Sequence, residues 1–152
     1  MKVQTSRFGE IEVPDSSSIR FPEGIVGFRN TTEFVMFDCG DQGVFKWLQS
    51  TQDPEIAFVI CEANLIVPNY QIIIGNKEAG ILGVENADDL LIALILSIPD
   101  DPHEMTANLL GPLLFNVQKR TGMQVVLINP AYSTRFKVFA PAEDAKSASK
   151  GA

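Results

Sequence analysis

The sequence predicts a mainly β fold, a small antiparallel barrel-like single domain with one or two short helices. Short apolar segments rich in Ile, Val and Phe recur along the chain, each separated from the next by Gly, Pro, Asn or Asp. Few segments keep helical apolar spacing, and the connections are too short for crossover helices. With 152 residues and 45% hydrophobic content, the chain suits one core. These observations indicate one antiparallel barrel or sandwich over residues 1–140.

Two short strands and a hairpin are predicted in the first third of the chain. The strands, 9–14 (GEIEVP) and 18–21 (SIRF), each stop at a proline. Residues 33–50 (EFVMFDCGDQGVFKWLQS) hold two apolar segments around a Gly-Asp-Gln-Gly turn, a composition typical of hairpins. Side chains alternate along a strand, so Phe45 and Trp47 share one face. Trp47 is therefore expected to be largely buried.

Further strands are predicted after the hairpin. Their segments are 55–61 (EIAFVIC), 70–74 (YQIII), 89–98 (DLLIALILSI), 123–128 (MQVVLI) and 134–139 (TRFKVF). The run at 90–98 also fits a buried helix, but its length and the closing Pro99 favour a strand. A short helix is expected within part of 105–119. Residues 141–152 lack apolar anchors, which predicts a disordered tail.

Residues 106–116 (TANLLGPLLFN) set two asparagines in an apolar run with Gly-Pro at its centre. Gly111 and Pro112 are expected to reverse or kink the chain, and residues 113–115 to enter the core. Asn108 and Asn116 would then satisfy backbone groups left unpaired at this irregularity, as buried amides generally must. The predicted role is structural.

Residues 21–28 (FPEGIVGF) form a glycine-containing loop with unusually many apolar side chains. Pro22 restricts the backbone, while Gly24 and Gly27 permit conformations closed to other residues. Phe21, Ile25 and Phe28 supply apolar surface. The favoured interpretation is a turn pinned by aromatic residues that covers one end of the barrel, and the alternative is a docking site.

The charge pattern argues against direct binding to nucleic acid. The net charge is −7, and between residues 47 and 118 there are ten carboxylates and one lysine, Lys77. Nucleic-acid binding needs a basic face that replaces phosphate counterions. An acidic body would instead steer a basic protein toward it. From charge alone, the favoured explanation is that the carboxylates keep a cytoplasmic protein soluble.

Nothing in the sequence indicates a membrane span or export. The longest nearly unbroken apolar run, 90–98, is about half the length that a bilayer-spanning helix needs. The first residues lack the apolar segment and cleavage site of a secretory signal, so a cytoplasmic protein is expected. Cys39 and Cys61 lack CxxC spacing and are interpreted as buried, reduced thiols, with a disulfide as the less favoured alternative.

Catalytic and metal sites have little support in the sequence. His103 is the single histidine, which rules out a multi-histidine metal site. A triad of Ser50, Asp53 and His103 has no supporting spacing. The acidic stretch 100–104 lacks the ligand spacing of a calcium loop and is interpreted as a solvated turn. We therefore predict no enzyme activity, no cofactor and no metal.

Three groups of segments resemble the FliW family of flagellar assembly factors. They are SRFGEIEV with FPEGIVGF, then FKWLQS followed by AFVIC, then TANLLGPLLFN followed by GMQVVLI. They occur in the family's order from about Val3 to Phe139, and the combination is more specific than any one segment. Gly111 stands where the family often has alanine, a mild departure.

The resemblance implies a small barrel-like protein without catalytic activity that acts through protein contacts. Family members bind newly made flagellin in the cytoplasm. When flagellin is exported, the freed factor binds the translational regulator CsrA and prevents it from repressing flagellin mRNA, by an allosteric route. CsrA is a basic RNA-binding protein, which agrees with the acidic charge of this chain. The expected partners are CsrA and flagellin, and a monomer is expected.

The binding residues are predicted from charge and exposure. For CsrA we expect the acidic side of the middle segment: Asp53, Glu55 and Glu62, with Leu65 and Ile66. For flagellin we expect the apolar loop residues Ile25, Val26 and Phe28. One competitive surface for both partners is the simplest switch. Residues assigned to the fold are Phe21, Pro22, Gly24, Gly27, Trp47, Asn108, Pro112 and Asn116.

Three alternatives remain open at this point. The chain could serve as a flagellin chaperone only. It could be a barrel whose interior holds a small apolar ligand, lined by some of its ten Phe side chains. An enzyme is the least favoured, because the chain has one histidine and no nucleophile motif.

Overall fold

The computed structural model describes residues 1–40 and 43–139. The predicted tail over residues 141–152 and the centre of the predicted hairpin turn lie outside the described residues. No helix in the described part of the chain is long and apolar enough to cross a bilayer.

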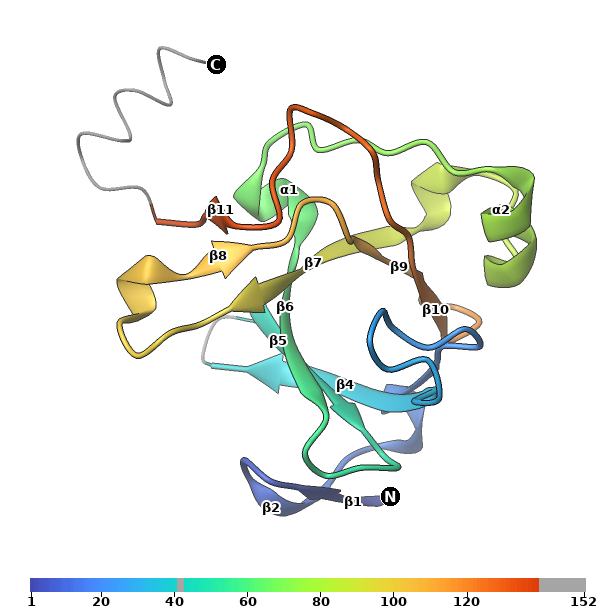
Figure 1. Ribbon diagram of the computed structural model, residues 1–152. Helices are drawn as coiled ribbons and strands as arrows, with labels where there is room; N and C mark the ends of the chain where they lie inside the picture. The colour runs from blue at the N-terminus through green and yellow to red at the C-terminus, as the bar shows by residue number, and fades with distance from the viewer. Residues whose placement is uncertain (41–42, 140–152) are drawn as a thin grey trace.

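The central feature is a closed barrel of seven strands within the described residues. In ring order they are β3 (Ser18–Arg20), β4 (Glu33–Cys39), β5 (Phe45–Ser50), β6 (Ala57–Glu62), β7 (Leu91–Ser97), β9 (Leu113–Asn116) and β10 (Thr121–Gln124). The additional pairing of β7 with β9 closes the ring (Figure 1). Neighbours are antiparallel except β10 and β3, which meet in a short parallel contact between Thr121 and Arg20. The mainly β, barrel-like fold predicted from the sequence is confirmed.

Smaller elements surround the barrel. The hairpin of β1 (Lys2–Thr5) and β2 (Gly9–Glu12) forms its own sheet, and β8 (Thr106–Ala107) and β11 (Phe136–Lys137) extend the edge beyond β7. The helices are α1 (Ala63–Ile66), α2 (Asn76–Leu82) and the 3-10 turns η1 (Asp15–Ser17), η2 (Ala87–Asp89) and η3 (Pro102–Glu104). In Figure 1, α1 and α2 lie at the end of the barrel opposite the β1–β2 hairpin.

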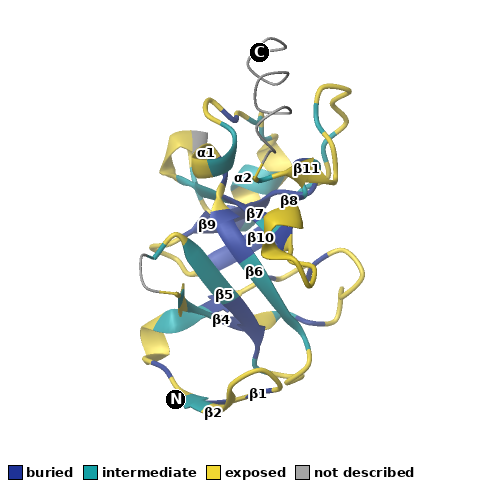
Figure 2. Cartoon of the chain, turned by 90° about the vertical axis from the view of Figure 1, so that its left-hand side faces the viewer, coloured by how far each residue is buried: buried dark blue, intermediate teal, exposed yellow. Residues whose placement is uncertain are grey.

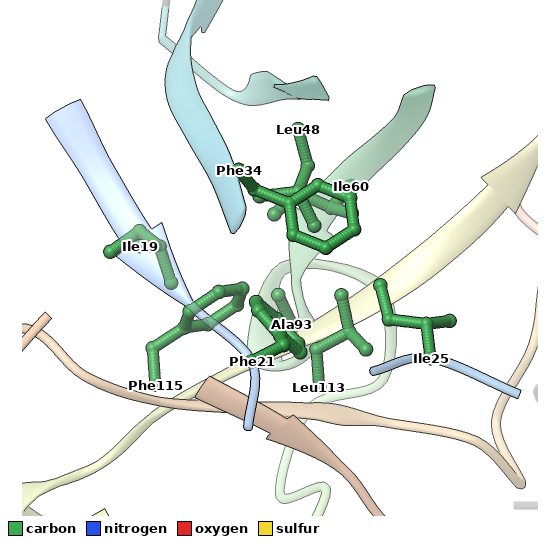
Figure 3. Packing of buried hydrophobic residues seen from close by; sticks show 9 residues of the cluster. All are labelled: Ile19, Phe21, Ile25, Phe34, Leu48, Ile60, Ala93, Leu113 and Phe115. Carbon is green, nitrogen blue, oxygen red and sulfur yellow. The ribbon is translucent and has the colours of Figure 1, made fainter. Parts of the chain in front are cut away.

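The barrel interior is filled by side chains. Phe21 lies between Phe34 and Phe115, with ring centroids 5.2 Å and 5.6 Å apart in edge-to-face arrangements. Figure 3 shows the full cluster: Ile19, Phe21, Ile25, Phe34, Leu48, Ile60, Ala93, Leu113 and Phe115. Burial concentrates on the barrel strands and exposure on the loops (Figure 2). A filled interior argues against the small-ligand alternative.

Three smaller apolar clusters cover the outside of the barrel. The β1–β2 hairpin packs Val3 and the following Val13 onto Val35 of β4. Residues of α1, the 105–109 segment and the chain near β11 cover β6 and β7. The α2 helix packs Leu82 onto the outer face of β9 and β10. The β1–β2 hairpin and the two α-helices are therefore held on the barrel mainly by apolar burial, whereas β8 also pairs with β7.

Two strand predictions are confirmed in detail. The segment 33–50 forms an antiparallel hairpin whose register pairs Phe37 with Trp47. The ambiguous run at 90–98 is the strand β7, which pairs with β6, β8 and β9. Pairing with three neighbouring strands supplies hydrogen-bond partners for the backbone of β7.

The prediction of a short helix within 105–119 was wrong. The segment instead contains β8, a bend and β9. The Asn108 side chain accepts hydrogen bonds from the backbone N–H groups of Leu110 and Gly111, at 2.9 Å and 3.1 Å, which holds the chain in a turn. The helices form elsewhere, over α1 and α2.

The prediction of a strand at 70–74 was also wrong. Its side chains alternate as in a strand: Tyr70 is buried, Ile72 and Ile74 are partly buried, and Ile73 is 97% exposed. The segment crosses the outside of the barrel, where Ile72 and Ile74 pack on the α2 cluster. Among the described residues it pairs with no strand, so the alternation reflects one-sided burial.

The strand predicted at 123–128 is shorter than expected, because β10 ends at Gln124. Beyond it, Val125 and Leu127 still donate to the carbonyls of Pro112 and Leu110. Pro112 has no N–H to return, and the N–H of Leu110 is already bonded to Asn108. The regular ladder therefore stops, and Val126 and Ile128 are exposed at 70% and 100%.

Candidate functional site

The predicted acidic surface is divided between the two ends of β6. Asp53 and Glu55 are exposed on the turn that joins β5 to β6. Glu62 is the last residue of β6, and Leu65 and Ile66 follow in α1. A six-residue strand separates the two groups by about 20 Å. We call the first group the turn surface (Asp53, Glu55) and the second the α1 surface (Glu62, Leu65, Ile66).

The α1 surface adjoins a small cleft. Leu65 is 62% exposed, Ile66 packs partly against the outer cluster, and Glu62 is exposed. The cleft beside them is about 40 Å³ and is lined mainly by β5, β6 and β7, including Lys46 and Ala93. Lys46 forms an ion pair with Asp38. Glu62 is therefore the unpaired carboxylate on the part of this cleft that the structure describes.

The turn surface is held from beneath by Gln49, a residue whose function was not predicted. Gln49 is fully buried, and its Nε2 lies 3.1 to 3.5 Å from four carbonyl oxygens. These belong to Ser50, Asp53, Pro54 and Ile56. A buried amide with this many acceptors fixes the path of the turn backbone.

Ser50 and Trp47 complete this hydrogen-bond network. The Ser50 hydroxyl accepts from the N–H groups of Gln52 and Asp53, both at 3.0 Å. The Trp47 indole donates to Gln49 Oε1 at 3.0 Å. The segment FKWLQS thus positions the turn that carries Asp53 and Glu55. Its only sequence signal was the presence of polar Gln and Ser in an otherwise apolar strand.

Trp47 is intermediate in burial, in agreement with the expected, largely buried indole, but it does not face the barrel interior. Leu48, its neighbour, faces the barrel interior, and Trp47 therefore points outward. There the β1–β2 hairpin covers it: the Phe8 ring contacts the indole edge-to-face at 4.9 Å. The outward face of β5 is therefore covered by the separate β1–β2 hairpin and does not contribute to the main core.

The 21–28 loop contributes side chains both to the barrel core and to an exposed apolar surface. Phe21 and Ile25 are 0% and 2% exposed and lie in the barrel interior (Figure 3). Val26 and Phe28 are 55% and 39% exposed. Ile25 therefore belongs to the core, and its side chain does not face a partner. Val26 and Phe28 form what we call the loop surface.

The backbone of this loop requires glycine at position 24. Gly24 has a φ of +68°, and a Cβ there would lie 2.5 to 2.6 Å from backbone atoms of Phe28 and Arg29. Gly27 also has a positive φ, +88°, but a Cβ would meet no atom within 4 Å. Pro22, between the core residue Phe21 and this turn, is exposed. The structural assignment of these residues agrees with the geometry.

Gln124 ties the loop to the Gly111 bend and was also missed by sequence reasoning. Its Oε1 accepts from the N–H of Val26 at 2.8 Å, and its Nε2 donates to the carbonyl of Gly111 at 3.0 Å. A Cβ on Gly111 would lie 2.8 Å from that nitrogen, so glycine at this position makes room for the link. Two of the segments that carry the resemblance, 21–28 and 106–116, thus meet at the Gln124 side chain.

Asn108 and Asn116 have the predicted structural function. Asn108 holds the bend before Pro112. Asn116 donates to the carbonyl of Leu82 at 2.7 Å and accepts from the N–H of Lys119. The first bond links β9 to the end of α2, and both of its residues are buried. The two amides satisfy backbone groups at irregular positions, as expected.

The loop surface and the turn surface adjoin each other. The Phe28 ring packs edge-to-face on Phe58 of β6 at 5.6 Å, three residues beyond Glu55. Close to the end of the loop, the N–H of Thr32 donates to Gln52 Oε1 at 3.0 Å. The loop surface and the turn surface are therefore linked through Phe58 and Gln52, whereas the α1 surface lies at the other end of β6.

The candidate catalytic groups are not brought together. His103 is exposed in η3 and its Nδ1 lies 3.1 Å from Asp101, within the predicted solvated turn. Hydrogen bonds from His103 lower the pKa of Asp101. The Ser50 hydroxyl is engaged by turn amides. Among the described residues, no group of three His, Cys, Asp or Glu could hold a metal ion.

Both cysteines are free thiols. Cys61 is buried and Cys39 partly buried. Burial raises the pKa of both thiols, and the neighbouring carboxylates of Asp38 and Glu62 add to the effect. Each side chain therefore favours the neutral thiol.

Comparisons with known proteins agree on one family. The family model described as FliW protein matches residues 2–138. The curated flagellar assembly factor FliW of Heliobacterium modesticaldum is 35% identical over 151 residues, covering 99% of each chain. That of Alkaliphilus metalliredigens is 38% identical over 136 residues, covering 89% of this chain and 84% of the relative.

A solved structure shows the same fold. The crystal structure of a flagellar assembly factor FliW superposes with a TM-score of 0.84 at 32% sequence identity. The match covers 93% of this chain and 99% of that chain. The overall fold of this chain is therefore that of a known flagellar assembly factor.

Proposed function

The chain belongs to the FliW family of flagellar assembly factors, and from that premise we propose that it is a non-enzymatic regulator with two protein partners. It binds flagellin in the cytoplasm. When free, it binds the translational regulator CsrA and relieves the repression of flagellin mRNA. Family membership over residues 2–138 is the observation that carries this proposal.

The charge and exposure of the turn surface support a basic partner. Asp53 and Glu55 are exposed on a turn that Gln49 and Ser50 hold in place. A fixed pair of carboxylates on a protein of charge −7 accelerates encounter with a basic protein. It also loses little conformational entropy on binding, because the turn is ordered beforehand.

The loop surface supports an apolar contact with flagellin. Val26 and Phe28 expose apolar area on the loop that Phe28 joins to Phe58 of β6. Adjoining surfaces allow flagellin and CsrA to exclude each other, which is the simplest switch between the two partners.

The turn surface is tested by charge removal. Asp53 Oδ1 accepts from the N–H of Glu55 at 3.0 Å, so Asp53→Asn keeps this acceptor and removes the charge. Combined with Glu55→Gln, it should slow association with CsrA roughly two- to tenfold at low salt and less at high salt. The matched control, Asp100→Asn with Glu104→Gln, removes two exposed carboxylates elsewhere.

Stopped-flow association at two salt concentrations distinguishes the outcomes. Equal slowing by the variant and the control would reduce the effect to net charge and discard the turn surface.

The loop surface is tested with flagellin. Val26→Lys should weaken flagellin binding, while Val117→Lys, at 56% exposure on the β9–β10 turn, should not. Equal effects of these two changes would discard the loop surface.

A further inference from the structure

A cleft of about 330 Å³ lies between the β1–β2 turn and the β5–β6 turn. Its walls come from two segments far apart in the sequence, Ser6 and Arg7 on one side and Pro54 and Glu55 on the other. Trp47 forms part of the floor, with Gln49 beneath. In Figure 1 the two turns lie at the end of the barrel where the β1–β2 hairpin packs.

An exposed aromatic ring stands beside this cleft. Phe8 is 47% exposed, although its ring also contacts Trp47 at 4.9 Å and Phe37 at 6.1 Å. Both contacts are edge-to-face, so the three rings form a connected aromatic group that reaches the solvent. Exposed aromatic rings beside a carboxylate are the usual chemistry of a site that binds a cation.

Both walls are fixed before any partner arrives. The Thr5 hydroxyl accepts from the N–H of Phe8 at 2.8 Å and donates to the carbonyl of Gly9 at 2.8 Å. The N–H of Ser6 donates to the carbonyl of Pro54 at 3.0 Å and joins the two turns directly. A preformed cleft of this kind loses little conformational entropy when a partner binds.

Two carboxylates and one base lie in or next to this cleft. Glu55 lines it, and Asp53 lies on the same turn. Arg7 is the one base among the residues that line it, and within the described chain it makes no ion pair. A guanidinium group suits a carboxylate next to an aromatic ring better than an ammonium does, because it is planar, stacks, and bonds a carboxylate through two N–H groups.

We propose that this cleft receives an arginine side chain of the basic partner, with the guanidinium stacked against Phe8 and bonded to Glu55. The proposal rests on the proposed function, since CsrA is the basic partner. It adds an aromatic anchor, formed by Phe8 and Trp47, to an interface that the carboxylates alone would make a steering surface. Arg7 then limits affinity, because it repels the incoming cation.

Two substitutions with opposite expected effects test the proposal by calorimetric titration with purified CsrA. Arg7→Gln should tighten binding roughly two- to fivefold, because it removes a like charge from the cleft. Phe8→Leu should weaken binding roughly three- to tenfold, because it keeps an apolar side chain but removes the aromatic face. A gain in affinity cannot come from a damaged fold.

The matched control for Arg7 is Arg135→Gln, an exposed arginine in the segment before β11. It makes the same charge change and should leave affinity within roughly twofold at 150 mM salt. Equal tightening by both arginine variants, or unchanged binding by Phe8→Leu, would overturn the proposal. If the unaltered chain fails to bind CsrA, the proposed function is wrong. The cleft then also loses the partner whose arginine it is proposed to bind.

Discussion

Replacing Gln49 with methionine tests how the turn surface is held. The Gln49 side chain is fully buried, its Nε2 faces four carbonyl oxygens, and its Oε1 accepts from the Trp47 indole. Methionine has nearly the same volume and flexibility, so the change removes the hydrogen bonds without leaving a large cavity.

The magnitude follows from counting hydrogens. An amide nitrogen has two, so the four carbonyls share about two bonds, and the indole supplies a third. The carbonyls of Asp53, Pro54 and Ile56 also accept from backbone N–H groups and are not orphaned by the change. Three bonds at about 1 kcal/mol each give a loss of about 2 to 4 kcal/mol. For a domain of this size the melting temperature should fall by roughly 4 to 16 °C.

Urea denaturation of the unaltered chain and of Gln49→Met measures the loss in the free energy of unfolding. The control is Gln118→Met on the exposed β9–β10 turn, which should change stability by less than about 0.5 kcal/mol. A loss below about 1 kcal/mol for Gln49→Met, with an unchanged denaturant slope, would refute the view that this amide organises the turn.

Three further predictions concern other parts of the fold. Gly24→Ala should destabilise the protein by at least about 2 kcal/mol more than Gly27→Ala in urea titrations, because both have positive φ but only Gly24 faces nearby backbone; equal losses would contradict the close approach. Asn116→Ala should cost about 1 to 3 kcal/mol by orphaning a buried carbonyl of α2, and a change under about 0.5 kcal/mol would count against that bond. The raised pKa values of Cys39 and Cys61 reduce the thiolate fraction near pH 8, so iodoacetamide should alkylate both thiols far more slowly in the native state than in urea. The alkylation rate of native Cys39 should still increase with pH above 9.0, since its pKa is raised from that value. Equal rates in the two states at pH 8 would contradict this.

The parts of the fold that sequence predicted well are those with strong local signals. The 33–50 hairpin combines two alternating apolar segments with turn residues, and it forms as expected. Asn108 and Asn116 were assigned correctly, because an amide in an apolar run needs backbone partners wherever it lies.

The errors arise where tertiary contacts decide the outcome. Residues 70–74 alternate like a strand, but the alternation comes from packing on one face, and pairing depends on a neighbour that the local sequence does not specify. The end of β10 depends on Pro112 and Asn108, which lie in a different segment. Local patterns carry no information about either.

The candidate site was predicted only in part. Exposure of Asp53 and Glu55 was expected from their charge, and the structure places both on a turn. Their separation from Glu62 by the length of β6 required the strand bounds. The proximity of Phe8 to Trp47 required the fold, since the hairpin that brings them together is a separate sheet.

The central claim is that one protein exchanges two partners. Calorimetric titration of the unaltered chain with CsrA, repeated after saturation with flagellin, tests it most directly. We predict binding to CsrA that flagellin abolishes, because the acidic turn surface and the apolar loop surface adjoin. Binding that flagellin leaves unchanged would contradict the exchange, and no binding to CsrA would leave a flagellin chaperone as the remaining function.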